Sequence, residues 1–439
     1  MSKNLPLNFK KRYFDILLAL VPISFILGNT IINLNFLFLI ISALLVFKLK
    51  IFKTKYYIFD KIIISFFFLI LITGIYNDFH LSENYSDLYK HKGSFATTLK
   101  SLSFFRFIIL YFTLRFLIEN KIINLKYFFI SSSFFVIFVS LDVIYQFYFG
   151  KDIFGFESPF KRKFPGPFND EAISGGYIQK FSFFAFFLIP FFFKENLKKY
   201  YKLIIFVLFL IFSFSIVLTG NRMPALLFFL SIVLVFIFIN NLKKYLFKFL
   251  ISLFIVITLA YNFSYKVKMN FGNMKFQIIE ISRVLIFKKP AEKEYVKSPY
   301  LREFQSSFDT WRLHKYIGGG IKNFRYYCHF RQNIHKNSSI ICNMHPHNYY
   351  LEILTETGLV GILIITCFLA SLFYTMIKRN IFKNKLYKNN LFVVFFILFL
   401  IEIFPIKSTG SLFTTNNATY FFLILGLLIG LLLKKKSLK

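Results

Sequence analysis

The chain has 439 residues and a formal net charge of +34 at pH 7, and 56% of its residues are hydrophobic, including 68 Phe. This apolar share is higher than that of soluble globular domains, and it excludes a single water-soluble core as the main fold. The apolar residues form blocks of about 17–25 residues, the length that crosses the hydrocarbon core of a bilayer. Because these blocks are near-continuous and do not alternate, they predict transmembrane helices and not barrel strands.

The sequence therefore predicts an all-α, polytopic transmembrane helical bundle of about twelve spans. In chain order the spans fall near 14–29, 31–48, 60–77, 103–119, 127–149, 177–193, 203–219, 223–241, 246–263, 349–377, 390–406 and 417–433. Only a few polar residues around Asn29 separate the first two. The predicted organisation is a transmembrane bundle over 1–263, one large outer loop domain over 264–348 and the remainder of the bundle over 349–439.

The basic residues gather in the short connections between these spans. The clusters lie at 10–12, 48–55, 194–202, 243–244, 378–388 and 434–436. With twelve spans and a cytoplasmic N-terminus, all of these clusters fall on the same side, which is the distribution that the positive-inside rule predicts. We therefore expect both termini in the cytoplasm, basic residues that anchor the protein to anionic lipid, and no nucleic-acid partner.

Three sizeable loops then lie on the outer side, at 78–102, 150–176 and 264–348, and a short polar stretch follows at 407–416. The largest of them holds five of the seven His residues, two of the three Cys and the only Trp. Long loops on a rigid scaffold are where binding and catalytic residues usually lie. The chemistry is therefore expected on the outer side.

The cysteines of the largest loop predict a covalent link. Cys328 and Cys342 have thirteen residues between them and face an oxidising compartment, so we expect a disulfide. Cys367 falls inside the tenth span and is expected to be a buried thiol. The alternative is a zinc site that combines the two loop cysteines with histidines of the same loop, although their spacing matches no standard zinc pattern.

The largest loop ends in HPHNYYLEILTETGLVG, residues 345–361, which leads directly into the tenth span. His347 and Asn348 therefore lie at a helix N-terminus, where free backbone N–H groups favour an anion. Glu352 and Glu356 are four residues apart and share a helix face at a depth where carboxylates are costly and face protein or water. The structural alternative is that His347 caps the helix while the carboxylates hold neighbouring helices together.

Two further motifs bring cations to the outer side. TGNRMPALL places Arg222 at the start of the eighth span, where a planar guanidinium is suited to bind phosphate. Snorkelling to lipid headgroups is the alternative role for this Arg. GGGIKNFR contains three glycines that let the backbone approach another group closely, and Lys322 and Arg325 follow them.

The outer loop 150–176 combines basic residues around Arg162 with acidic residues that include Glu171. On composition alone, this loop is predicted to be an ordinary solvated turn.

Together, these four segments resemble the O-antigen ligase family, a branch of the larger ligase and polymerase superfamily. HPHNYYLEILTETGLVG is close to the family's His-Pro-His-Asn, Glu, Glu-x-Gly signature at the start of a late span. GGGIKNFR is similar to its Gly-x-Gly-x-x-Asn-Phe element, and TGNRMPALL to its Arg-containing turn before a middle span. FPGPFNDEAISGGY resembles a Gly-x-Phe-x-x-Glu element of some members. These matches cover about 150–361, and the twelve-span topology extends the likeness over the chain.

The resemblance implies an inverting, metal-independent glycosyltransferase without a cofactor, in the bacterial inner membrane with its active site facing the periplasm. Its donor would be an undecaprenyl-diphosphate-linked glycan, and its acceptor a hydroxyl of the lipid A core of lipopolysaccharide. The family's conserved His corresponds to His347 and its middle Arg to Arg222, both taken as catalytic. A second family Arg lies in the large loop, where Arg302 is the first choice, Arg325 the second and Arg312 the third.

The chemistry of the residues agrees with this reading. A diphosphate leaving group needs positioned cations, and an acceptor hydroxyl needs a base that works near neutral pH, which suits His. The predicted substrate-binding residues are Arg302, Arg325, Lys322, Asn348, Glu352, Glu356, Arg162 and Glu171. We expect Arg222 and His347 to flank one gap at a separation of about 10 Å, because the base must reach its own target. Spans eight and ten are expected to pack near each other beneath the largest loop.

Three alternatives stay open. An O-antigen or exopolysaccharide polymerase uses the same donor with a second lipid-linked glycan, and a protein O-oligosaccharyltransferase uses Ser or Thr of a protein. A lipid-linked glycan transporter is more remote, because no paired broken spans or symmetric halves are apparent. Asp142, in the fifth span, would be its best intramembrane ionisable group.

Overall fold

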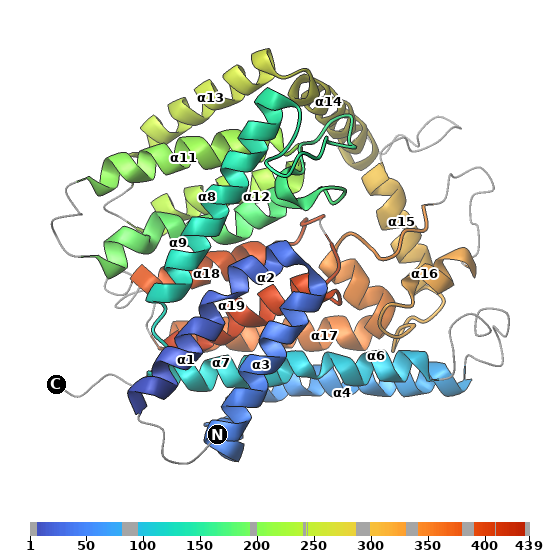
Figure 1. Ribbon diagram of the computed structural model, residues 1–439. Helices are drawn as coiled ribbons and strands as arrows, with labels where there is room; N and C mark the ends of the chain where they lie inside the picture. Colours follow the sequence, from blue (N-terminus) through green and yellow to red (C-terminus); the bar gives the residue numbers. More distant parts are fainter. Residues whose placement is uncertain are drawn as a thin grey trace.

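The computed structural model describes residues 7–80, 95–193, 200–239, 243, 245–286, 299–330, 341–379, 390–408 and 410–434. These residues form helices and short connections, so the all-α prediction is confirmed (Figure 1). Parts of four predicted basic clusters lie outside the described residues, and so does His335, one of the histidines of the alternative zinc site.

Each of the twelve predicted spans is helical. They correspond to α1 (Leu7–Ala19) with α2 (Val21–Leu27), α3 (Asn29–Phe47), α4 (Ile58–His80), α6 (Ala96–Phe104) with α7 (Arg106–Glu119), α8 (Lys126–Phe149), α9 (Ser174–Phe192), α11 (Tyr201–Leu218), α12 (Arg222–Phe238), α13 (Leu246–Phe263), α17 (Tyr349–Lys378), α18 (Asn390–Glu402) and α19 (Thr415–Leu433). Within the described residues, nine helices are long and apolar enough to cross a membrane, while α12 and α18 are shorter apolar helices. The chain is therefore built as an integral membrane protein, and the number twelve stays a prediction.

The bundle is held together by close helix contacts and by aromatic rings. On α19, a Cβ added at Gly430 would lie 2.7 Å from the Cβ of Ile118 on α7, so the two backbones approach closely there. Small residues at such contacts are typical of helix packing in membranes. Phe128 on α8 packs edge-on against Phe184 on α9, with ring centroids 4.7 Å apart. The buried face of the bundle is therefore assembled largely from Phe.

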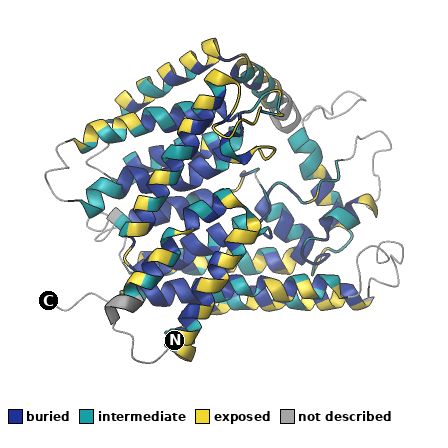
Figure 2. Ribbon diagram, in the orientation of Figure 1, coloured by how far each residue is buried: buried dark blue, intermediate teal, exposed yellow. Residues whose placement is uncertain are grey.

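Cys367 is exposed on the surface of the bundle, which corrects the expectation of a buried thiol. Figure 2 shows many exposed residues on the outer helices, and only 22% of the most apolar window of α17 is buried. An apolar span contacts either protein or lipid, and both environments are apolar, so composition alone did not decide which way this side chain faces.

Several basic connections between helices meet at one end of the bundle. Arg379 donates hydrogen bonds to the carbonyl of Leu432 (3.0 Å) and to the hydroxyl of Tyr57 (2.7 Å), and Arg115 donates to the carbonyl of Lys55 (2.6 Å). The connections after α3, after α17 and after α19 therefore meet at one end, as the charge pattern predicts for three of the clusters.

The other end carries the described parts of 264–348, and we call it the loop end. They form α14 (Tyr265–Ile286), α15 (Pro299–Trp311), α16 (Phe324–Tyr327) and a short 3-10 turn at Cys328–Phe330. Figure 1 shows α15 between α14 and α16 at the ends of the long helices, and α15 packs against α17.

Spans eight and ten, which are expected to pack near each other, do not pack directly on each other. Among the described helices, α12 packs mainly against α9, α11 and α18, and it has no extensive contact with α17. The segment after α13 connects the two instead, because α14 contacts Arg222 at the start of α12 and α15 packs on α17.

Candidate functional site

α17 is broken at Gly358, whose φ of +68° is a left-handed conformation that glycine adopts without strain. The segment 315–320 lies across the break and bonds to the backbone groups that it frees. The bonds are Leu359 N–H to Lys315 O (2.9 Å), Val360 N–H to Tyr316 O (3.1 Å), Gly319 N–H to Thr355 O (3.0 Å) and Gly320 N–H to Glu356 O (2.9 Å). Hydropathy alone predicts one continuous span here. The break persists because the loop supplies the missing backbone partners.

The glycines of GGGIKNFR let this segment lie directly on α17 and α6. A Cβ at Gly318 would clash with the backbone of Glu356, and one at Gly320 would lie 2.6 Å from Cγ2 of Thr97. The expected close backbone approach is therefore confirmed at both positions. It places Lys322, which has a φ of +60°, near the carboxylate of Glu356.

Glu352 and Glu356 lie on α17 as predicted, but their contacts differ. The buried carboxylate of Glu352 accepts hydrogen bonds from the hydroxyl of Ser411 and from the N–H of Leu412 (2.6 Å). The carboxylate of Glu356 is also buried; the backbone N–H groups of Lys322 and Phe324 face it, but neither oxygen makes a hydrogen bond of good geometry with the described residues. Glu352 therefore matches the structural alternative, whereas Glu356 does not.

Asn348, and not His347, is the N-cap of α17. Its side-chain oxygen accepts from the N–H groups of Tyr350 (3.0 Å) and Leu351 (3.1 Å), and its Nδ2 donates to the carbonyl of Pro405 (2.7 Å). These bonds use the helix N-terminus that the sequence suggested for an anion. Asn348 thus holds the start of α17 in place, and His347 keeps its ring for other contacts.

His347 lies beside α15. Its Nε2 is 3.9 Å from Oε1 of Glu303, an ion-pair distance, and the same Oε1 accepts a hydrogen bond from Nδ2 of Asn343 (2.7 Å). An acidic group opposite one imidazole nitrogen orients the ring and leaves the other nitrogen to meet a ligand.

The predicted disulfide between Cys328 and Cys342 is confirmed, with their Cα atoms 5.7 Å apart. It ties the segment that carries Asn343 to the 3-10 turn after α16, which itself packs on α15. Both thiols are used in this bond, which excludes the zinc site that needed them. No three His, Cys, Asp or Glu side chains in the described part of the chain gather as metal ligands.

Two more histidines line this region as neutral rings. His345 lies next to His347, with ring centroids 4.8 Å apart. Burial, with His347, Arg325 and Lys322 nearby, lowers the pKa of His345 to about 4. Burial also lowers the pKa of His314 to about 4. At neutral pH neither ring adds positive charge, so the net charge of the region comes from Lys and Arg.

Arg222 begins α12, as predicted, and meets cations from another loop. Its Nη1 donates to Oε1 of Gln277 on α14 (2.6 Å), and its guanidinium interacts electrostatically with Tyr300 and Arg162. Lys163 lies near both Arg162 and Arg222, and burial lowers the pKa of its ammonium. Three basic side chains therefore gather at this point.

The loop that carries Arg162 is held in place by the start of α12 and by α14. Asn270 donates to the carbonyl of Arg162 (2.6 Å), and Asn221 donates to the carbonyl of Ala172 (2.7 Å). The loop is therefore packed, in contrast to the solvated turn that its composition predicted. The side chain of Glu171 is exposed.

One of the three candidates for the second family Arg lies on α15, and another directly follows it. Arg302 lies in the same helical turn as Tyr300 and Glu303, which approach Arg222 and His347. Arg312 follows the last residue of α15, where it pairs with Asp309 (3.6 Å) and is half-exposed. This placement favours Arg302 over Arg312.

The two proposed catalytic residues reach the same helix from different directions. Arg222 interacts with Tyr300, and His347 faces Glu303 at 3.9 Å. Residues three apart on a helix are neighbours, with Cβ atoms about 5–6 Å from each other. α15 therefore lies near both side chains, which are 125 positions apart in the sequence.

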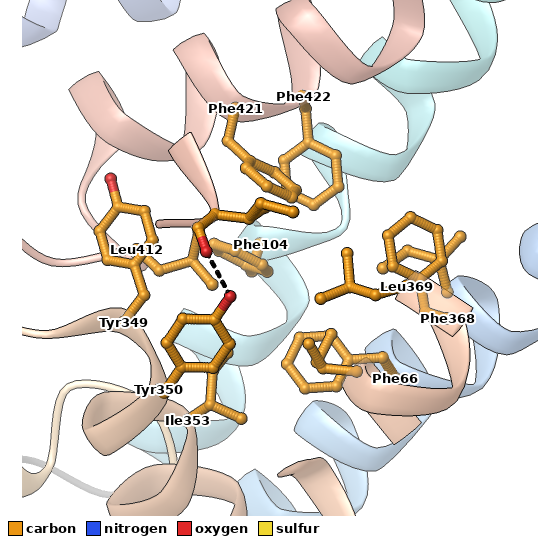
Figure 3. A pocket seen from close by; sticks show the side chains of 13 residues that line it. Phe66, Phe104, Tyr349, Tyr350, Ile353, Phe368, Leu369, Leu412, Phe421 and Phe422 are labelled. Carbon is orange, nitrogen blue, oxygen red and sulfur yellow. Dashed lines mark hydrogen bonds between the residues drawn. The ribbon is translucent and has the colours of Figure 1, made fainter. Parts of the chain in front are cut away.

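An apolar pocket lies behind Tyr349 and Tyr350 (Figure 3). Its lining comes from α4, α6, α17, α19 and the segment after α18, and Tyr350 closes one side by donating to the carbonyl of Ile403 (2.6 Å). Its volume of about 40 Å³ has room for a few water molecules and not for a sugar. The candidate site is instead the polar region beside α15, where Arg222 and His347 approach the same helix.

The part of the chain that builds this region has known relatives. Residues 206–366 match the O-antigen ligase family. The match runs from α11 to α17 and contains Arg222, His347 and the glycine segment, so the resemblance noted in the sequence is confirmed there. Members of this family transfer glycans. None of the curated proteins matches the chain.

Three residues of this region were not among the sequence-based candidates: Glu303 opposite His347, Gln277 against Arg222, and Lys100 near Lys322. No motif marks Glu303 or Gln277. The available signal was their position on polar helices within the largest loop. Lys100 had a weaker signal, because it lies in a serine- and threonine-rich stretch just before an apolar span.

Proposed function

We propose that this protein transfers a glycan from an undecaprenyl-diphosphate carrier to a hydroxyl of the lipid A core of lipopolysaccharide, as an O-antigen ligase. The observation that carries the proposal is the approach of Arg222 and His347 to neighbouring positions of α15, within a region that matches the family. The proposed donor and acceptor are both lipid-linked, which explains why the site is built at the end of a membrane bundle.

The donor diphosphate is proposed to bind beside Arg222, Arg162 and Lys163. Two of these cations come from the 150–176 loop and one from α12, so their positions are fixed by different elements. Cations aimed at the leaving oxygen stabilise the charge that develops as the bond to the anomeric carbon breaks. Because side chains perform this task, the proposed reaction needs no metal ion.

His347 is proposed to activate the acceptor hydroxyl. Its Nε2 faces Glu303, so the proton from the hydroxyl would pass to Nδ1, and the carboxylate would stabilise the imidazolium. The hydroxyl oxygen forms the new glycosidic bond while the diphosphate leaves from the opposite side of the anomeric carbon. A single displacement of this kind inverts the anomeric configuration and requires no enzyme nucleophile.

The proposed topology has twelve spans, both termini in the bacterial cytoplasm and the loop end in the periplasm. It is supported by the meeting of three basic connections at the end of the bundle opposite α14, α15 and α16. The proposed division is a transmembrane bundle over 1–263 and 349–439, with 264–348 as the periplasmic segment.

The deciding experiment is transfer in vitro from a lipid-diphosphate glycan to purified lipid A core, with and without chelator. Transfer with inverted configuration that survives chelation supports the proposal, and loss of transfer on chelation would overturn its metal-independent form. Supplying only a second lipid-linked glycan, or only an acceptor protein, tests the polymerase and protein-glycosylation alternatives in the same assay. Movement of the intact carrier lipid without transfer would favour a transporter.

A further inference from the structure

A second group of cations lies near His345, and none of them is among the neighbours of Arg222. α6 packs against the glycine segment, where Nδ2 of Asn323 donates to Oγ1 of Thr97 (3.2 Å). Lys100 lies one turn further along α6, with its ammonium 5.8 Å from the ring centroid of Tyr326. It interacts electrostatically with Arg325 and Lys322. Helix α6 and the glycine segment therefore bring three positive side chains together.

Glu356 offsets the charge of these three cations only in part, through its electrostatic interactions with them. Lys100, Lys322 and Arg325 form no ion pair or side-chain hydrogen bond with the residues that the structure describes, and Nε of Arg325 is buried without a partner. Burial lowers the pKa of Lys322, Glu356 opposes this lowering, and Arg325 adds to it. Three cations beside one carboxylate keep a net positive charge at partial burial, which a bound anion would stabilise.

Glu356 lies beside the same group. Its side chain is only 1% exposed, and both carboxylate oxygens lack a hydrogen-bond partner among the described residues. The backbone N–H groups of Lys322 and Phe324 face the carboxylate without making hydrogen bonds of good geometry. A buried polar group without a partner is costly, and such groups are usually satisfied when a site binds its ligand.

The position of this group relative to the base indicates which substrate it serves. His345 lies next to His347 and also interacts electrostatically with Arg325 and Lys322. Arg222, on the donor side, instead approaches Tyr300. The acceptor must place its hydroxyl at His347, so its neighbouring sugars extend toward the second group of cations.

We propose that Lys100, Lys322, Arg325 and Glu356 form an acceptor subsite that binds an acidic sugar. The three cations bind its phosphate or carboxylate group, and Glu356 accepts hydrogen bonds from its ring hydroxyls. This inference rests on the proposed function, because it assigns the subsite to the acceptor of that reaction. It adds that the acceptor is selected by negative charge as well as by its hydroxyl.

The first test compares lipid A core that carries phosphate on its core sugars with the same glycolipid after enzymatic dephosphorylation of those sugars. For Lys100→Gln we expect the KM for the phosphorylated acceptor to rise about tenfold, with kcat and the donor KM unchanged. With the dephosphorylated acceptor, this variant and the wild type should be alike. Lys151→Gln is the matched control, because Lys151 is exposed and pairs with Glu157 outside this region.

A second test does not depend on transfer. Trp311 is the only Trp of the chain and lies at the end of α15, where its indole N–H bonds to the carbonyl of Lys315 just before the glycine segment. In detergent and without donor, the phosphorylated acceptor should change the fluorescence of Trp311 at lower concentration than the dephosphorylated one. Lys100→Gln should remove that difference. Phosphatidylglycerol in the same micelles tests whether a lipid headgroup is the source of the anion.

The outcomes separate the two proposals. Equal binding of both acceptors, or an unchanged preference in Lys100→Gln, would overturn the subsite, as would full competition by phosphatidylglycerol. Selective, Lys100-dependent binding by a protein that shows no transfer would support the subsite and reject the proposed ligase reaction. A tenfold effect on the donor KM in place of the acceptor KM would reassign the cations to the donor and overturn the acceptor assignment.

Discussion

Two regions of this protein bury charged side chains, and they do so in opposite ways. At the end of the bundle where the basic connections meet, Arg115 bonds to Asp60 (2.6 Å), to Glu119 (2.7 Å) and to the carbonyl of Lys55 (2.6 Å). Tyr111 completes this network by donating to Asp60 (2.6 Å). At the loop end, Glu356 and the cations around it make no such bonds within the described residues.

The difference shows how to separate structural charges from functional ones. A network in which every buried group has a partner fixes the packing of helices and leaves nothing for a ligand. A group of buried charges that face each other without pairing has unused hydrogen-bonding capacity, as substrate sites do. Variants can test this difference. Substitutions in the first region should affect folding, and substitutions in the second should affect only transfer or binding.

The largest effect is expected from Arg115→Met. The substitution leaves the carboxylate of Asp60 buried without its cation, and breaking a buried ion pair in this way costs about 3–5 kcal/mol. We expect a large loss of folded protein in membranes and a lower thermal unfolding temperature in detergent. Arg115→Met combined with Asp60→Asn should recover part of the loss, because the uncompensated charge is removed. Normal abundance of the single variant would contradict a structural role for this network.

Next in size is the loss of transfer in Arg222→Ala and His347→Ala. Removing a group that stabilises the leaving charge, or the general base, reduces the rate by about 100- to 1,000-fold. Membrane abundance and unfolding temperature should stay near those of the wild type, since neither residue belongs to a saturated network. Arg222→Lys is the matched comparison, because it keeps the charge but not the planar guanidinium. Full activity in either alanine variant would remove that residue from the proposed mechanism.

The helices and the main motifs could be predicted from the sequence because they depend on local patterns. Apolar blocks define the spans, and His347 and Arg222 stand out as polar residues at helix ends. The contacts that distinguish Glu352 from Glu356 could not be predicted, since the partner of Glu352 is Ser411, 59 positions away. Two carboxylates on one helix face therefore looked equivalent in the sequence and are different in the structure.

Long-range contacts also explain the remaining differences. The break in α17 at Gly358 depends on backbone partners from the segment 315–320, which no hydropathy pattern reveals. Glu303 acquires its place opposite His347 only when α15 packs on α17. The orientation of Cys367 was missed because protein and lipid are equally apolar neighbours. Sequence thus predicts elements well, and it predicts poorly which side chains meet.

Removing the disulfide should have an intermediate effect. A bridge that closes a loop of this length stabilises by about 3 kcal/mol in the chain-entropy account. In Cys342→Ser, the link from the bridge through Asn343 to Glu303 is loosened, so transfer should fall while the membrane bundle stays folded. Thiol labelling of the wild type should show only Cys367 before reduction and all three cysteines after it. Three labelled cysteines without reductant would contradict the bridge, and Cys367→Ser is the control for labelling.

A smaller effect is expected from Glu303→Gln. The amide keeps the size of the side chain but cannot stabilise an imidazolium at His347, so kcat should fall about tenfold with both KM values unchanged. Asn343→Ala should reduce kcat less, because it only frees Glu303. Gln305→Ala, on the exposed side of α15, is the control. An unchanged kcat in Glu303→Gln would leave His347 without an orienting partner.

The smallest effect is expected from lowering the pH, which should destabilise the loop end. His314 and His345 have pKa values of about 4 in the folded protein, lowered mainly by burial from an ordinary value of 6.5. Between these values the unfolded segment binds more protons than the folded one, so stability rises with pH. The stability of the folded loop end with these two neutral rings is therefore complete above about pH 6.5, and it is lost as the pH falls toward 4. Fluorescence of Trp311 should report a local transition in this range, which His314→Gln shifts to lower pH. His329→Gln, at an exposed histidine, should not shift it. If the transition stayed in place in both His314→Gln and His345→Gln, these buried rings would not be its cause, and the pH sensitivity of the loop end would have to come from its carboxylates.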